Sequence, residues 1–179
     1  ASRRAVLEAA LHLIEEKGTA KGITMEAIAR EAGVGKQTLY RWWSGTGEIF
    51  LEILHEHAEE KIDAVDGGND LRTFLIRTFQ ALNPPVRLIL KAAMAEAALD
   101  NRFRDRLVAG LIAQRRAVLE EVLQRTPKFS GGDHATLIDC IFGFMWYRLL
   151  LDVGPLESNN GEELAGLLLA SWPPGRKEQ

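Results

Sequence analysis

Residues 24–43 read TMEAIAREAGVGKQTLYRWW, and this stretch carries the strongest structural signals in the chain. Two short helices that cross at a sharp angle need a small residue where their backbones approach, a turn residue that tolerates positive φ, and an apolar residue that locks the second helix in place. Ala29, Gly33 and Leu39 meet these needs in that order. Thr24 also has the side chain of a good N-cap. The stretch therefore predicts two short helices joined by a tight turn at Gly33.

The rest of the chain also has the periodicity of helices. Val6, Ala9 and Leu13, for example, fall on one side of a first helix that ends before Gly18. No segment alternates with a period of two for long enough to indicate a sheet. The later predicted helices are residues 48–65, 71–82, 85–99, 101–124, 133–153 and 162–172. We expect an all-α fold in which an N-terminal three-helix, helix-turn-helix domain (residues 1–46) precedes a larger helical bundle (residues 47–179).

The charge balance and the single cysteine restrict the classes of function. The formal net charge is −3, so any contact with nucleic acid has to come from a local basic patch rather than from a uniformly basic surface. Cys140 has no partner for an internal disulfide, which fits a reducing cytosol. No secretory signal opens the sequence, and its apolar runs are too short to cross a bilayer. We therefore expect a cytoplasmic protein.

The second helix of the 24–43 stretch has an unusual surface. Lys36 and Arg41 are its cations, and no acid occurs between Val34 and Thr46. The N-terminal residues of such a helix reach base edges in the major groove, where lysine can donate to guanine and glutamine can pair with adenine. Lys36 and Gln37 are therefore the expected base readers. Taken alone, the two cations would be ordinary solvated residues, but the surrounding helix-turn-helix pattern favours DNA contact by both.

Other donors on this helix suit phosphate oxygens, which fix the register of a protein on DNA without reading its sequence. These donors belong to Thr38, Tyr40 and Trp42. Neighbouring positions on a helix point about 100° apart. Only one of Trp42 and Trp43 can therefore face the core, and we expect it to be Trp43.

The string GVGKQTLYRWW at residues 33–43 resembles the helix-turn-helix of TetR-family regulators, and ITMEAIA at residues 23–29 resembles the helix that precedes it. The resemblance is sharp over residues 3–54, and beyond them it is a likeness of length, helix order and all-α character. It implies a bacterial DNA-binding regulator in which Leu39 and Trp43 belong to the core. The positions that it assigns to DNA contact are Thr24, Lys36, Gln37, Thr38, Tyr40 and Trp42. Thr46 stands where the family commonly has a lysine, so we expect its phosphate contact to be weaker and made through the hydroxyl and backbone amides.

The helices predicted at residues 133–153 and 162–172 are apolar almost all round. A terminal helix of this kind has to be covered both by its own bundle and by another surface. We therefore predict a homodimer, as the TetR resemblance also implies for the last two long helices. The predicted interface residues are Leu137, Ile141, Phe144, Arg148, Leu164, Leu167 and Leu168. The alternative is that both helices close the core of one chain. Separately, we expect Cys140 to be a small buried residue.

The TetR resemblance further implies a small-molecule effector that binds among the middle helices and releases the DNA. The candidate pocket residues are Phe74, Arg77, Phe79, Met94, Phe103, Trp146 and Tyr147. The aromatic ones also fit ordinary core packing. We expect a repressor that binds a palindromic operator as a homodimer and releases it on binding the effector. An effector-independent DNA-binding factor and a helical protein-interaction module are the alternatives.

Nothing in the sequence predicts an enzyme, a cofactor or a metal site. His55 and His57 are two positions apart, so they face different directions on a helix. No cluster of cysteines or carboxylates completes a tetrahedral ligand set. We therefore expect both histidines to be solvated or packed.

Overall fold

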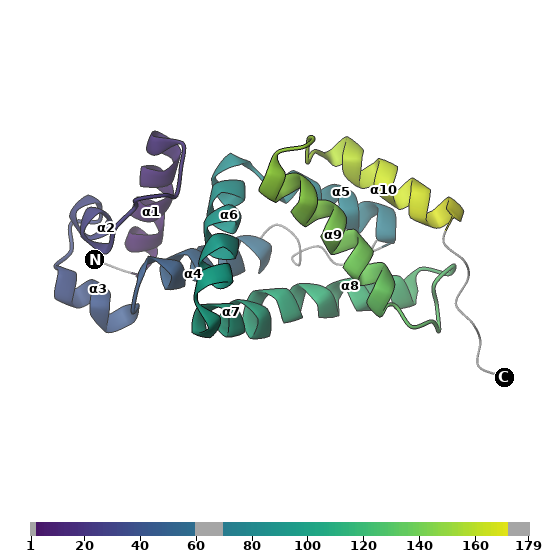
Figure 1. The fold of residues 1–179 in the computed structure, drawn as a ribbon, viewed down its shortest axis with the longest axis horizontal. Coiled ribbons are helices and arrows are strands. Elements are labelled where there is room, and N and C mark those ends of the chain that lie inside the picture. The colour runs from purple at the N-terminus through teal and green to yellow at the C-terminus, as the bar shows by residue number, and fades with distance from the viewer. Residues whose placement is uncertain (1–2, 60–69, 172–179) are drawn as a thin grey trace. The chain divides into compact units, whose positions relative to one another are not determined.

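The computed structural model of the protein describes residues 3–59 and 70–171. Helices form most of these residues, and no strand occurs among them (Figure 1). The predicted all-α fold is therefore confirmed. In these two ranges, no helix combines the length and the apolar character needed to cross a membrane.

The chain packs as two compact units, and the first comprises Ala1–His57 and Asn83–Leu111. Its helices are α1 (Arg3–Lys17), α2 (Met25–Glu31), α3 (Lys36–Trp42), α4 (Thr46–Ala58), α6 (Pro84–Leu99) and α7 (Asn101–Leu107). α2 packs against α1 and α3, and α6 packs against α1 and α7. The three N-terminal helices thus share a packing unit with later helices, and the functional division between residues 1–46 and 47–179 stays a prediction.

Local interactions explain the corner between α2 and α3. The Thr24 hydroxyl oxygen accepts a hydrogen bond of 3.1 Å from the Ala27 backbone N–H and so caps α2. Gly33 has a φ of +65°, which residues with a Cβ rarely adopt. The Val34 N–H then returns to the Ala29 carbonyl oxygen at 2.9 Å. The predicted N-cap and the predicted positive φ in the turn are both confirmed.

The second unit comprises Ala58–Leu82 and Ile112–Gln179. Its described helices are α5 (Leu71–Ala81), α8 (Ala113–Arg125), α9 (Ala135–Leu151) and α10 (Ser158–Ser171). α5 lies along α10, and α8 packs against both α5 and α9 (Figure 1). The contact between α5 and α10 is close because Gly161 has no side chain: a Cβ there would lie 2.6 Å from the Leu75 carbonyl oxygen.

The helix predicted over residues 101–124 is interrupted. α7 ends at Leu107, a π-helical turn follows over Val108–Ile112, and α8 begins at Ala113. A π turn changes the backbone hydrogen-bonding step from four residues to five, so it shifts the register of the side chains that follow. The boundary between the two units falls inside this turn, after Leu111.

The other predicted helices agree with the structure except at their ends. α10, for instance, begins at Ser158 rather than at residue 162. Three predicted features lie outside the described residues. These are the end of the helix at residues 48–65, the break at residues 67–69, and the last residue of the helix at 162–172.

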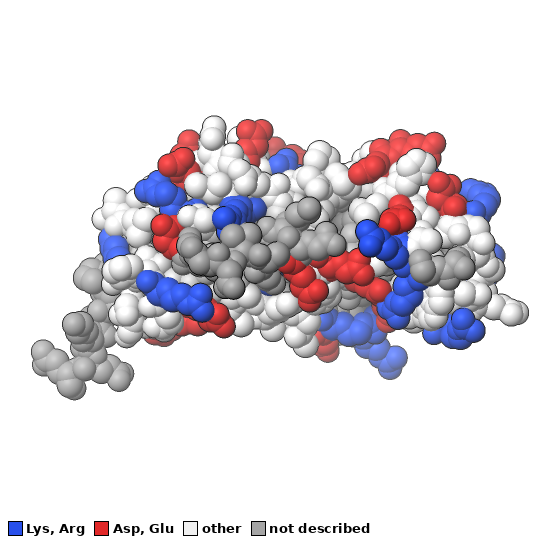
Figure 2. All heavy atoms as spheres, turned by 180° about the vertical axis from the view of Figure 1, so that it is seen from behind, with Lys and Arg blue, Asp and Glu red and all other residues white. Residues whose placement is uncertain are grey.

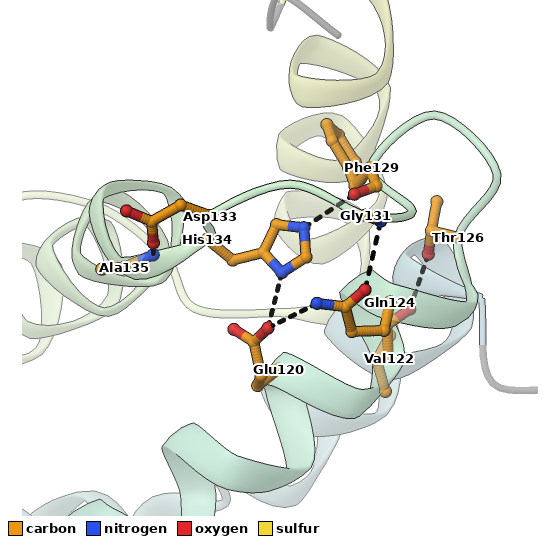
Figure 3. A network of polar contacts seen from close by, with 9 residues as sticks. All are labelled: Glu120, Val122, Gln124, Thr126, Phe129, Gly131, Asp133, His134 and Ala135. Atoms are coloured by element: carbon orange, nitrogen blue, oxygen red, sulfur yellow. Dashed lines mark hydrogen bonds and ion pairs between the residues drawn. The ribbon is translucent and has the colours of Figure 1, made fainter. Parts of the chain in front are cut away.

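A polar network holds the connection between α8 and α9 (Figure 3). The two ring nitrogens of the buried His134 lie 2.8 Å from a Glu120 carboxylate oxygen and 2.8 Å from the Phe129 carbonyl oxygen. The Gln124 side chain donates to Glu120 and accepts from the Gly131 backbone N–H. Because buried polar atoms need hydrogen-bond partners, these contacts determine how the chain enters α9.

Candidate nucleic-acid interface

α3 presents one continuous exposed face. Lys36, Gln37, Tyr40 and Arg41 are exposed, and at about 100° per residue they cover an arc of about 140° around the helix. Leu39 lies on the opposite side and is fully buried, as predicted. Tyr40 keeps 50% of its surface exposed although its ring is large. A face with two cations, an amide and a phenol offers donors that suit phosphates and base edges.

The base readers predicted from the sequence lie in the first turn of this helix. Lys36 and Gln37 directly follow Gly35, which is the N-cap of α3. Both side chains therefore occupy the end of the helix from which a recognition helix reaches base edges. Their role as base readers stays a prediction.

The other predicted DNA contacts differ in exposure. Thr24 is exposed, and the half-buried ones are Thr38, Trp42 and Thr46. The Trp42 ring meets the Trp43 ring edge-on, with 5.6 Å between their centroids. The Arg41 guanidinium lies 5.7 Å from the centre of the Trp42 ring. Trp42 thus links the core to the exposed face of α3.

Trp43 anchors the C-terminal end of α3 and is buried, as predicted. Its indole N–H donates to the Glu52 carboxylate on α4 over 2.6 Å. Arg3, at the start of α1, pairs with the same carboxylate, and its guanidinium lies 4.8 Å from the centre of the Trp43 ring. Residues of α1 and α4 therefore hold the residue that ends α3.

The first turn of α4 follows α3 closely and is tightly packed. The Glu48 carboxylate accepts a hydrogen bond of 2.7 Å from the Ser44 backbone N–H, which lowers the pKa of Glu48. A Cβ at Gly47 would lie 2.5 Å from a Glu96 carboxylate oxygen and 2.6 Å from the Phe103 ring. Burial raises the pKa of the Glu96 carboxyl. α6 and α7 thus contact α4 where it begins.

Sequence reasoning missed the partners of the α3 residues. The Lys36 ammonium lies 2.9 Å from the Glu26 carboxylate on α2. The stretch between Val34 and Thr46 contains no acid, and Glu26 lies outside it, on the preceding helix. The helical period of α2 places Glu26 away from the buried Ile28, so it predicts that Glu26 is exposed. The period does not predict the distance between Glu26 and Lys36.

Surface charge outside α3 is mixed. In Figure 2, basic and acidic side chains are interspersed over the face shown, with no wholly basic area covering it. This agrees with the net charge of −3. The face shown in Figure 2 therefore offers no uniformly basic surface for nucleic acid.

The predicted dimer residues divide between the core of the second unit and its surface. Leu167 is 63% exposed, whereas the buried ones are Leu137, Ile141, Leu164 and Leu168. Phe144 and Arg148 are half-buried. The prediction that Cys140 is buried is wrong, because it is exposed on α9. Apolar residues occur all round α9, so periodicity did not show which side faces the core.

The predicted effector-pocket residues are distributed over both units. Met94 and Phe103 belong to the first unit and the others to the second. Phe74, Phe79 and Phe103 are buried, and Tyr147 is 60% exposed. The half-buried ones are Arg77, Met94 and Trp146. An open depression of about 520 Å³ in the second unit is lined by other residues, including Arg116, Glu120 and His134. The assignment of an effector pocket stays a prediction.

Two family descriptions match the chain. The description "Bacterial regulatory proteins, tetR family" matches residues 6–53, and "Tetracyclin repressor-like, C-terminal domain" matches residues 63–168. The second match alone covers more than half of the chain.

Curated relatives are similar along most of their length. The uncharacterized HTH-type transcriptional regulator YdeS of Bacillus subtilis is 27% identical over 157 residues, which are 84% of this chain and 79% of that protein. The DNA-binding transcriptional repressor TetR of Mycobacteroides abscessus is 28% identical over 182 residues, which are 97% of this chain and 95% of that protein.

Solved structures have the same fold. The TetR family transcription regulator SCO0332 is 29% identical with a TM-score of 0.69, over 96% of this chain and 98% of that one. The fatty acid degradation regulator FadR from Bacillus halodurans is 17% identical with a TM-score of 0.67, over 95% of each chain, and shows the fold alone. With a helix-turn-helix that exposes one face of α3 and family matches on either side of residue 60, the chain belongs to the TetR family of DNA-binding transcriptional regulators.

Proposed function

We propose that this regulator is a cytoplasmic, homodimeric repressor that binds a two-fold-symmetric DNA operator and releases it when a small, largely apolar effector binds. The exposed face of α3 is the observation that carries the proposal. Lys36 and Gln37, in the first turn, read base edges in the major groove. Tyr40 and Arg41 bind the phosphate backbone and fix the register.

The length of α3 and the surface of α9 support a homodimer. A recognition helix of seven residues reads few base pairs, so two copies on a two-fold axis are needed for a specific site. From residue 140 onward, the exposed residues of α9 recur every three or four positions along the helix, which is the spacing of a helix that packs on another helix. These residues are Cys140, Gly143, Tyr147, Leu150 and Leu151.

Two further observations favour a second copy as the partner of this face. Gly143 has no other atom within 4 Å of the place where a Cβ would stand, although glycine inside a helix costs stability. The close approach of a partner helix explains a small residue there. Leu167 of α10 adds a side chain that is 63% exposed, and apolar surface of this kind is typical of an interaction site.

Control by an effector rests on the C-terminal part of the chain. Residues 63–168 match the C-terminal domain described as Tetracyclin repressor-like, and the relative from Mycobacteroides abscessus is named a repressor. Arg77 and Trp146 of the second unit are half-buried, so part of each side chain is accessible. A ligand that binds better to the arrangement that does not fit the operator shifts the protein away from DNA.

We expect α4 to transmit the conformational change caused by the effector to α3. Its first turn begins directly after Trp43 and Ser44, and Glu96 and Phe103 contact that turn at Gly47. A displacement of α6 or α7 therefore acts on α4 close to the recognition helix.

The test of the proposal is selection of bound sequences from a random duplex library, followed by titration of the enriched site at several salt concentrations. We expect a two-fold-symmetric site whose binding weakens steeply with salt, because phosphate contacts release counterions. Small apolar compounds added to the complex are then expected to include one that displaces the protein. Failure to enrich any site would favour a protein-interaction module, and an enriched site that no compound displaces would favour an effector-independent factor.

Placing charges on the exposed apolar face is expected to separate the dimer. A Leu151→Glu plus Leu167→Glu variant should sediment as a folded monomer and bind the selected site about 100-fold more weakly or worse, because the two half-sites are no longer bound together. Leu99→Glu is the matched control, since Leu99 is 91% exposed on α6 in the first unit. A double variant that stays dimeric at the same protein concentration would place the interface elsewhere.

A further inference from the structure

Glu26 is an acidic side chain within the candidate DNA-binding surface. It lies in the first turn of α2 and follows the N-cap Thr24 by two residues. Its carboxylate lies 2.9 Å from the Lys36 ammonium, and 47% of its side chain is exposed. The contact joins the two helices of the helix-turn-helix across the turn at Gly33.

The surroundings of Glu26 favour its charged form. Its pKa is lowered, first because Lys36 donates a hydrogen bond to it, then through its own backbone N–H, with a further contribution from the Thr24 hydroxyl. Lys36 and Thr24 are both predicted to contact DNA. The Glu26 carboxylate therefore pairs with an ammonium that DNA would also use.

A carboxylate and a phosphate are alternative partners for the same ammonium, because both form charge-assisted hydrogen bonds with it. Lys36 keeps 59% of its side chain exposed, so it is open to either partner. An exposed ion pair contributes little net stability, and the exchange is therefore close to balanced. While Lys36 is paired with Glu26, it neutralises no phosphate and releases no counterion.

We propose that Glu26 competes with DNA for Lys36 and thereby lowers the affinity of the protein for random-sequence duplexes. In a random duplex, one phosphate has to displace the carboxylate. At an operator that presents guanine to Lys36, the base edge offers two acceptors and displaces it more readily. Weak binding to random DNA matters because a genome holds a large excess of competing sites. Only the operator part of this proposal rests on the proposed function above.

The test is the binding of a Glu26→Gln variant to a random-sequence duplex of fixed length, measured by fluorescence anisotropy between 50 and 200 mM salt. We expect an affinity about three- to tenfold higher at 50 mM salt, and a log–log salt slope steeper by about 0.9 for each subunit bound. Glu26→Asp keeps the charge, so it should bind much as the unaltered protein does. Far-UV circular dichroism checks that each variant is folded.

Glu31→Gln is the matched control. Glu31 lies on the same helix, but its partner is His12 on α1, at 2.8 Å. Removal of its charge should change the affinity less than about twofold, because the remaining effect is screened by salt. When both substitutions are made in a Lys36→Met protein, Glu26→Gln should change the affinity for the random duplex no more than Glu31→Gln does.

Two results would overturn the competition between Glu26 and DNA. One is a Glu26→Gln variant that binds random duplexes no more tightly than the Glu31→Gln variant. The other is a Glu26→Gln variant that binds them more weakly than the unaltered protein, which would mean that Glu26 positions Lys36 for DNA. Both results are affinities for random-sequence duplexes and need no operator. They therefore test the competition even if the selection experiment enriches no site.

Discussion

Replacing Lys36 and Gln37 together with alanine is expected to lower the affinity for the selected operator by about 1000-fold or more. Each good base-edge contact contributes about 1–3 kcal/mol of discrimination, and a two-fold-symmetric complex contains each contact twice. Both side chains are exposed in the first turn of α3, so their loss leaves the core intact. The measurement is competition between the selected site and a random duplex at one salt concentration.

The same variant should bind random duplexes within about threefold of the unaltered protein, because Lys36 paired with Glu26 contributes little counterion release there. The matched control is Lys17→Ala plus Gln80→Ala, which removes the same two kinds of side chain from exposed positions on α1 and α5. That control should bind both DNAs normally. If the Lys36 and Gln37 variant still discriminates the operator as well as the unaltered protein, other residues read the bases.

Replacing Gly161 with alanine is expected to lower the free energy of unfolding by about 2–3 kcal/mol, as overpacking of a close contact does. The new Cβ would lie 2.6 Å from the Leu75 carbonyl oxygen and 2.7 Å from the Phe79 ring. The Leu75 atoms belong to the backbone of α5, and Phe79 is only 2% exposed. Neither can yield locally, so α10 has to move away from α5.

Gly166→Ala is the control for this prediction, because it makes the same change on the same helix. No other atom lies within 4 Å of a Cβ at Gly166. Alanine there should raise the free energy of unfolding by about 0.5–1 kcal/mol through its better helix propensity. Both variants are compared by chemical denaturation at one protein concentration. Equal stability of the two would contradict the close contact of α5 with α10.

Much of the DNA-binding part could be predicted from the sequence because its determinants are local. The N-cap at Thr24, the positive φ at Gly33 and the buried Leu39 all depend on residues close together in the chain. The helical period then places Lys36 and Gln37 on the exposed side of α3. The family resemblance rests on the same residues, and the match over residues 6–53 confirms it.

Other features of the fold could not be predicted from the apolar periodicity of the sequence. The π turn at Val108–Ile112 interrupts a segment whose apolar pattern predicts one helix, because its changed hydrogen-bonding step alters the register. On α9, apolar residues occur on every side, so the pattern indicated neither that Leu137 is buried nor that Cys140 is exposed.

The sequence by itself determined the helix-turn-helix corner and the all-α class, because caps, backbone conformation and helical period act between near neighbours in the chain. Only the tertiary structure decided that Glu26 pairs with Lys36, that Glu52 holds Trp43, and which side of α9 is covered. Those contacts join residues on different helices. Their distances are set by how the helices pack, and no single helix encodes that packing.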